Sequence, residues 1–228
     1  MTLKHTSDSD SRTVAAALLD AGCVTARTDE PFRLPSGWAS PVYIDCRRLI
    51  SFPALRRDLI RRAQAVLSAA GALDNVQSVV GGEASGIALA AWLADALDLP
   101  LQYVRKKPAG QSQIEGVLEP GSKVLLVDDM MAGGQSKLRF CQALAAGGAH
   151  VEDLFIVFDY ATFPTEELLD PLGVRVHALA TWHDIWQVAS ERNDFSPEVI
   201  DELAEFLRDP TAWSRDRGGR ASYHDISP

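Results

Sequence analysis

Two adjacent carboxylates stand at the centre of the stretch KVLLVDDMMAGGQSK. The apolar residues 124–127 predict a buried strand that ends at Asp128 and Asp129. The glycines at 133–134 let the backbone come close to a ligand, and a helix is predicted to begin at Ser136. Carboxylates accept hydrogen bonds from sugar hydroxyls, while free backbone N–H groups at a helix start suit a phosphate. The stretch therefore predicts a site for one ribose 5-phosphate.

The same residues also permit an interpretation without any ligand. In it, Asp129 caps a loop and the two glycines form a tight turn, as junctions between a strand and a helix often do. Both interpretations stay open for this stretch taken alone.

A second glycine loop lies in the stretch VVGGEASGIA, residues 79–88. It has the same order of strand, glycine loop and helix. A turn of this kind is on its own a weak signal, because it is commonly only a tight connection. The acidic stretch later in the chain has the same arrangement and therefore strengthens the prediction of a ligand site here.

Three cations stand together in a third stretch, YVRKKPAGQSQIEG, at the end of a predicted strand. They are Arg105, Lys106 and Lys107. Cations in a water-poor site stabilise the negative charge that develops on a leaving group. The alternative is a charge run that is solvated at the surface.

The elements that must position these residues alternate along the chain. Short apolar strands that alternate with helices predict an α/β fold with a parallel sheet covered on both faces, and such sheets bind ligands at the carboxyl ends of their strands. The strands are predicted at 78–80, 102–104, 123–127, 154–158 and 174–179, and the helices between them at 55–67, 86–97 and 136–146.

The predicted organisation is one core with additions at both ends. Residues 1–12 are polar and are expected to be flexible. Residues 13–54 contain a helix and a small Pro- and Gly-rich layer. The core covers residues 55–190, and residues 191–228 form a C-terminal helix and a loosely held tail.

The composition of the 228-residue chain argues against several classes of protein. A net charge of -9 disfavours a general binder of nucleic acid or of anionic membranes, because such partners require a basic surface. No apolar run is long enough to cross a bilayer, and the N-terminus lacks the apolar core of a signal peptide. Cys23, Cys46 and Cys141 form no CxxC pair. We expect a reduced, cytoplasmic protein without nucleic-acid or membrane partners.

Taken together, these motifs resemble those of type I phosphoribosyltransferases. The acidic stretch resembles the phosphoribosyl pyrophosphate signature, and residues 81–86 resemble the pyrophosphate loop. The segment PFRLPSGWASPVYID resembles the base-binding segment of orotate phosphoribosyltransferases, with its SGxxSPxY pattern. The resemblance runs from about residue 15 to residue 182 and implies the type I phosphoribosyltransferase fold, in which the N-terminal layer is a hood over the core sheet.

The resemblance implies a role for each motif. The catalytic residues would be Asp128, Asp129, Arg105 and Lys106. Phosphoribosyl pyrophosphate would be bound by Asp128, Asp129, Met130, Met131, Ala132, Gly133, Gly134, Gln135, Ser136, Arg105, Lys106, Lys107, Gly81, Gly82, Glu83, Ala84, Ser85 and Gly86. The base would be bound by Ser36, Gly37, Ser40, Tyr43, Ile44, Ala132 and Tyr160. For Trp38, contact with the base and simple hydrophobic packing of the N-terminal layer are equally good interpretations.

The implied reaction is the transfer of the phosphoribosyl group of phosphoribosyl pyrophosphate to orotate, which gives orotidine 5'-monophosphate for UMP biosynthesis. The resemblance also implies Mg²⁺ as cofactor, without a predicted direct protein ligand, and a homodimer. The segment after Arg105 and Lys106 would be a mobile catalytic loop.

Several positions depart from the family pattern. Ala132 and Gln135 replace threonines of the 5-phosphate loop. Pro35 and Tyr160 stand where many members carry a lysine and an arginine that face the orotate carboxylate. Two alternatives therefore stay open: transfer to another base, and a non-catalytic regulatory protein that binds phosphoribosyl pyrophosphate.

Overall fold

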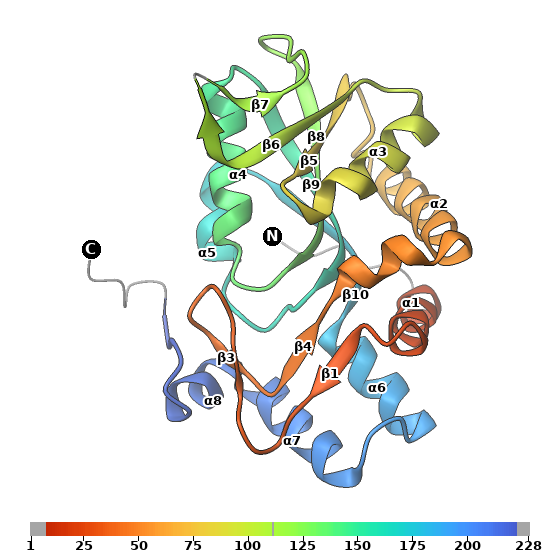
Figure 1. The fold of residues 1–228 in the computed structure, drawn as a ribbon, viewed down its shortest axis with the longest axis vertical. Coiled ribbons are helices and arrows are strands. Elements are labelled where there is room, and N and C mark those ends of the chain that lie inside the picture. The colour runs from red at the N-terminus through yellow and green to blue at the C-terminus, as the bar shows by residue number, and fades with distance from the viewer. Residues whose placement is uncertain (1–7, 111, 223–228) are drawn as a thin grey trace.

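The computed structural model describes residues 8–110 and 112–222. Its main strands are β5 (Ser78–Gly82), β6 (Leu101–Ala109), β7 (Ser112–Glu115), β8 (Lys123–Met131), β9 (His150–Asp159) and β10 (Arg175–Thr181). Within the described residues they form one six-stranded sheet in the order β10-β9-β8-β5-β6-β7 (Figure 1). Neighbouring strands pair in parallel, except that β7 runs antiparallel to β6 at one edge. The predicted α/β fold class with a mostly parallel sheet is confirmed.

Helices cover both faces of this sheet. One face is covered by α1 (Asp8–Asp20), α2 (Pro53–Ala69) and α3 (Ser85–Leu97), with α6 (Trp182–Arg192) packed beside α1. The other face is covered by α4 (Gln135–Ala146) and the short α5 (Glu166–Leu169), which the 3₁₀ helix η2 (Asp170–Leu172) continues. In Figure 1, α4 and α5 lie to the left of the sheet and α2 and α3 to the right.

The central strands are buried on both faces, which explains their continuous apolar sequences. Leu125 and Val127 of β8 join the core under α1, α2 and α3, whereas Leu126 points into the core under α4. Side chains alternate between the faces of a strand, so a strand covered on both sides needs apolar residues at every position.

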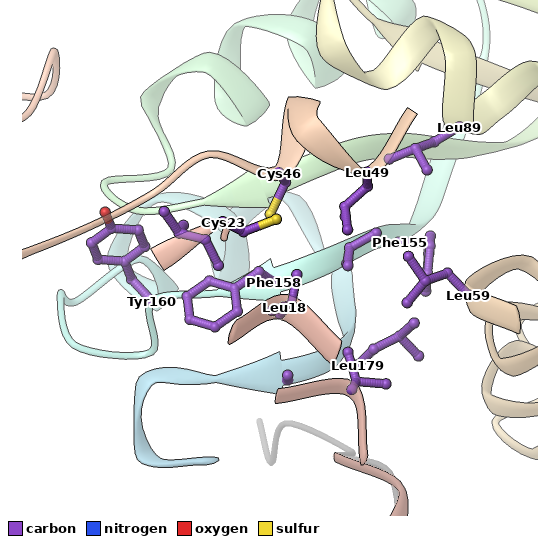
Figure 2. Packing of buried hydrophobic residues seen from close by; sticks show 14 of the residues in the cluster. Leu18, Cys23, Cys46, Leu49, Leu59, Leu89, Phe155, Phe158, Tyr160 and Leu179 are labelled. Carbon is purple, nitrogen blue, oxygen red and sulfur yellow. The ribbon is translucent and has the colours of Figure 1, made fainter. Parts of the chain in front are cut away.

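The hood consists of two short antiparallel strand pairs. β1 (Val24–Ala26) pairs with β4 (Val42–Ile44), and β2 (Phe32–Arg33) pairs with β3 (Ala39–Ser40). The 3₁₀ helix η1 (Cys46–Ser51) follows β4 and contacts β8. Figure 2 shows Cys46 in one apolar cluster with Phe158 of β9 and with Tyr160. The cluster fixes the hood against the carboxyl end of β8.

The helix α1 begins earlier than the sequence predicts. The prediction placed its start at residue 13 and treated residues 1–12 as flexible, but the helix begins at Asp8. The reason is a tertiary contact, because the Ser11 hydroxyl is buried and donates to Asp184 Oδ1 at 2.6 Å. The prediction is wrong for residues 8–12, and residues 1–7 lie outside the described part of the chain.

The C-terminal region is packed, in contrast to the predicted loose tail. After α7 (Pro197–Arg208), the helix α8 (Pro210–Asp216) lies against β3. Ser214 is fully buried, and its hydroxyl accepts a hydrogen bond from Ala39 N at 2.9 Å and donates to Arg220 O at 2.7 Å. The prediction of a loose tail is wrong for residues 209–222, which support the hood; residues 223–228 lie outside the described part.

Candidate active site

A cavity of about 350 Å³ opens at the carboxyl ends of β5 and β8, between the hood and the start of α4. The predicted site residues that line it are Ser36, Tyr43, Ile44, Glu83, Ser85, Lys106, Asp128, Asp129, Met130, Met131, Ala132, Gly133, Gly134, Gln135, Ser136 and Tyr160. Further lining residues are Leu34, Pro35, Asp45, Arg47, Lys137, Arg139 and Phe140. The four separate motifs therefore meet in one place.

The acidic pair lies inside β8 rather than just beyond it. The sequence predicted a strand that ends at residue 127, but β9 continues alongside and Met131 still pairs with Asp159. Asp128 Oδ2 accepts from the Lys137 ammonium at 2.5 Å, and both side chains are almost fully buried. The acidic strand end is thus held to the first turn of α4 by an ion pair.

The charge of Asp128 acts strongly on Asp129, because the two carboxyl groups are adjacent and shielded from water. Burial, followed by the charge of Asp128, raises the pKa of Asp129 to about 7, and the nearby Lys137 opposes this shift. Near neutral pH, Asp129 can therefore donate a hydrogen bond when protonated and accept one when ionised. Such a pair suits the two hydroxyls of a ribose.

The loop after β8 leads directly into α4. Gly134 caps the helix with a φ of +69°, a conformation that favours glycine. A Cβ on Gly133 would lie 2.6 Å from Ser36 Cβ, so this glycine allows the loop and the hood to touch. The first N–H groups of a helix have no partner within it, and Gln135 and Ser136 at the start of α4 line the cavity. A phosphate fits here.

The glycines of the second loop bring it against β8. A Cβ on Gly86 would lie 2.4 Å from Val127 O and 2.9 Å from Asp128 Cα. Of the predicted loop, the residues that line the cavity are Glu83 and Ser85. Gly81, Gly82, Ala84 and Gly86 do not line it, and the three glycines instead permit close packing.

The three predicted cations separate in the structure. The segment predicted as a mobile loop forms the β6–β7 hairpin, in which Arg105 Nε donates to Glu115 Oε1 at 2.7 Å. Lys106 lines the cavity, and its backbone N–H donates to Glu83 Oε2 at 2.7 Å. Neither Arg105 nor Lys107 lines the cavity. The cation brought to the site by this motif is therefore Lys106.

Only some of the predicted base-binding residues line the cavity. Ser36 lines the cavity, and its buried hydroxyl has no hydrogen-bond partner within the described residues, so it is available to a ligand. Tyr43 and Ile44 line the cavity too. Ser40 does not, since its hydroxyl donates to Val42 O at 2.8 Å, and Gly37 is turned toward the C-terminal region, where its carbonyl accepts from Arg220 N.

Two large aromatic side chains, Trp38 of the hood and Tyr160 after β9, are packed against other aromatic rings. Trp38 is fully buried and stacks on Phe163, with ring centroids 4.5 Å apart, which favours the packing alternative for this residue. Tyr160 forms the floor of the cavity, is fully buried, and meets Trp182 edge to face. Burial raises the pKa of Tyr160 far above its ordinary value, so the side chain stays neutral.

Sequence reasoning missed four charged residues of the cavity: Asp45, Arg47, Lys137 and Arg139. Lys137 and Arg139 follow the phosphate loop closely in the first turns of α4, and the tilt of helical side chains toward the helix N-terminus was a signal that could have found them. Arg47 gave no such signal, because η1 was not predicted and only this helix turns its side chain toward the cavity.

A second, larger hollow of about 870 Å³ lies along β10 and α5. None of the predicted site residues lines it. His177 is buried at its wall, with Nε2 2.7 Å from Asp153 Oδ1. The smaller cavity is the candidate active site, because the acidic pair, the phosphate loop and the hood meet there.

Two further features concern metal binding and membrane insertion within residues 8–110 and 112–222. Within these ranges no cluster of three or more His, Cys, Asp or Glu side chains is arranged to hold a metal ion. Within the same ranges no helix is both long and apolar enough to span a membrane.

Known proteins resemble this chain over most of its length. Residues 54–160 match the family model of the phosphoribosyl transferase domain. The orotate phosphoribosyltransferase of Ruegeria sp. is 43% identical over 206 residues, which cover 89% of this chain and 91% of that protein.

Solved structures share the fold as well. The orotate phosphoribosyltransferase of Aeropyrum pernix superimposes with a TM-score of 0.67 at 30% identity and covers 79% of this chain and 99% of its own. The UMP synthase of Leishmania donovani has a TM-score of 0.76 at 25% identity, and the match covers 88% of this chain and 43% of that larger one.

Proposed function

The chain belongs to the orotate phosphoribosyltransferase family, and from this we propose that it transfers the phosphoribosyl group of phosphoribosyl pyrophosphate to orotate. The products are orotidine 5'-monophosphate and pyrophosphate, and the reaction serves UMP biosynthesis. The observation that carries the proposal is the meeting of the acidic pair, the start of α4 and the hood around one cavity.

The ribose 5-phosphate half of the substrate would be held by β8 and α4. Asp128 and Asp129 accept hydrogen bonds from the ribose hydroxyls. The backbone N–H groups between Ala132 and Ser136, together with the Ser136 hydroxyl, bind the 5-phosphate. The threonine hydroxyls that are missing at positions 132 and 135 leave the backbone as the main donor.

The pyrophosphate leaving group would lie toward β5 and β6. The C1–O bond breaks toward an oxocarbenium-like state, and negative charge grows on the pyrophosphate oxygens. The Lys106 ammonium stabilises that charge, because Lys106 lines the cavity and its backbone is tied to Glu83 of the neighbouring loop. N1 of orotate then attacks C1, and no covalent enzyme intermediate forms.

Mg²⁺ fits this site as an ion that is held mainly by substrate oxygens. Mg²⁺ commonly binds one or two carboxylates together with substrate phosphates. The cavity offers Asp128 and Asp129, while the described residues contain no protein cage for a metal. When bound, the ion neutralises pyrophosphate oxygens. Chelation by EDTA is expected to abolish turnover, and added Mg²⁺ to restore it.

We also propose a homodimer and a cytoplasmic location for this enzyme. The free state of Cys23, Cys46 and Cys141 supports a reducing compartment. Sedimentation equilibrium of the purified protein tests the dimer.

A second candidate function has its own supporting observation. Arg105 is engaged by Glu115 and does not line the cavity, which would suit a regulatory protein that binds phosphoribosyl pyrophosphate without turnover. Transfer to a base other than orotate is the third candidate, and the loss of both family cations at Pro35 and Tyr160 supports it.

One set of assays separates the candidates. Pyrophosphate release is measured with phosphoribosyl pyrophosphate, Mg²⁺ and a panel of pyrimidine and purine bases. Of these bases, only orotate is expected to give rapid release of pyrophosphate. Release with a different base would move the activity to that base. No release, accompanied by thermal stabilisation of the protein with phosphoribosyl pyrophosphate, would support the regulatory protein; saturation at a hundred times the dissociation constant adds about 2.7 kcal/mol.

A further inference from the structure

Orotate carries a carboxylate on its ring, next to the nitrogen that attacks the sugar. Removing such a group from water without a cation is costly. The two positions at which the family resemblance implies cations hold Pro35 and the buried, neutral Tyr160. We propose that Arg47 binds the orotate carboxylate and thereby sets the base specificity, an inference that rests on the proposed function.

Within the described residues, four cationic side chains line the cavity: Arg47, Lys106, Lys137 and Arg139. Lys137 forms an ion pair with Asp128 at 2.5 Å, next to the proposed ribose site. Arg139 lies on α4 beyond the phosphate loop, and Lys106 lies on β6 next to the pyrophosphate loop. Each of these three belongs to a part of the cavity that phosphoribosyl pyrophosphate would occupy in the proposed function.

Arg47 is the cationic side chain that lines the cavity from the side of the hood. It follows β4 in η1, directly after Tyr43 and Ile44, which line the same cavity. The pKa of Arg47 is raised chiefly by its hydrogen bond and charge interaction with Asp45, and the charges of Tyr43 and Asp129 contribute in the same direction. Arg47 thus lines the same cavity as the base-binding strand β4 and the carboxylate of Asp129.

Asp45 fixes the direction of this guanidinium. Arg47 Nε donates to Asp45 Oδ1 at 2.6 Å, and Nη2 donates to Oδ2 at 2.9 Å. A guanidinium has five N–H donors, so three remain, and they have no further acceptor within the described residues. A planar guanidinium with free N–H groups matches a carboxylate. The Arg47 side chain is 60% exposed, so it lies at the mouth of the cavity and stays hydrated until the base enters.

The test compares variants of two adjacent arginines. Arg47→Gln removes the charge, and Arg47→Lys keeps the charge but loses the planar fork. Arg48→Gln is the matched control, because Arg48 does not line the cavity and instead donates from Nε to Ala21 O at 3.1 Å. The KM values for orotate and for phosphoribosyl pyrophosphate are measured separately for each variant, together with Tm.

Arg47→Gln is expected to raise the KM for orotate by about ten- to a hundredfold, as for the loss of a charge-assisted hydrogen bond, without change in the KM for phosphoribosyl pyrophosphate. Arg47→Lys should recover part of the loss, and Arg48→Gln should match the parent. An orotate KM that is unchanged in both Arg47 variants, or an equal rise for both substrates, overturns the inference while the proposed function stands. A parent without orotate turnover overturns the proposed function itself and the inference with it.

Discussion

Lys137 Nζ lies 2.5 Å from Asp128 Oδ2, and both side chains are less than a tenth exposed. The pair joins the first turn of α4 to the carboxyl end of β8. These are the two elements that bind the ribose and its 5-phosphate in the proposed function. The ion pair therefore sets the relative position of the two halves of the phosphoribosyl site.

Replacing Lys137 by Met should destabilise the protein, because it leaves Asp128 buried without its partner. We expect the free energy of unfolding in urea to fall by about 3–5 kcal/mol. The control is Lys123→Gln, at the opposite end of β8, where Lys123 pairs with the exposed Glu152 and the loss should be about 0–1 kcal/mol. Equal losses in the two variants would contradict this role for Lys137.

The raised pKa of Asp129 makes stability depend on pH. Its carboxyl titrates at about 7 in the folded chain and near 3.8 in a model peptide. Between these values the folded state binds more protons than the unfolded state, so the free energy of unfolding should rise as the pH falls from about 7 to about 4. The rise should be a few kcal/mol, at about 1.4 kcal/mol per pKa unit. Urea unfolding across this range measures it.

Two variants identify which carboxyl group causes the pH dependence of stability. Burial also raises the pKa of Asp159, to about 6, so this residue contributes in the same direction but over a narrower range. Asp129→Asn should flatten the profile between about pH 6 and 7, whereas Asp159→Asn should leave that interval steep. A parent-like slope there in Asp129→Asn would show that another group titrates.

Gly86 should tolerate no side chain. Its Cβ would lie 2.4 Å from Val127 O, so Gly86→Ala must push the pyrophosphate loop away from β8. We expect a loss of about 1–3 kcal/mol in stability and weaker binding of phosphoribosyl pyrophosphate, measured by calorimetry. Gly173→Ala is the control, because nothing lies within 4 Å of that position and only its positive φ of 70° opposes the change. Its affinity for phosphoribosyl pyrophosphate should equal that of the parent.

The packed C-terminal region should support the base site. Ser214→Ala removes the acceptor for Ala39 N, in a buried contact between α8 and the hood, and the donor to Arg220 O within the C-terminal region. A loss of about 1–3 kcal/mol in unfolding free energy is expected, together with a higher KM for orotate. Ser190→Ala, which removes only a bond to Trp186 O within α6, should leave the orotate KM unchanged.

The sequence predicted the core of the fold because its signals are local. Buried parallel strands are continuous apolar runs, and the helices between them carry their own start and end signals. The residues that line the cavity on β8 and the phosphate loop were also predictable, since a strand end followed by a glycine loop determines where the next helix begins. Asp128, Asp129 and Ser136 all line it.

What the sequence did not reveal depends on contacts between distant segments. Ser11 extends α1 only because Asp184 lies opposite it, and Ser214 holds the C-terminal region only because β3 is there. Arg105 was predicted to face the site, but Glu115 of the paired strand β7 engages it instead. The partners of Ser11 and Ser214 lie far away in sequence, so no periodicity or motif indicates them, whereas Glu115 reaches Arg105 only because β7 pairs with β6.

The most direct test of the proposed function is the loss of orotate ultraviolet absorbance in the presence of phosphoribosyl pyrophosphate and Mg²⁺. The parent is compared with an Asp128→Asn/Asp129→Asn double variant whose folding is checked by circular dichroism. We predict a steady loss of absorbance with the parent and none with the double variant. A parent that leaves orotate unchanged, or a folded double variant that consumes it at the parental rate, would contradict the assignment of orotate transfer to this cavity.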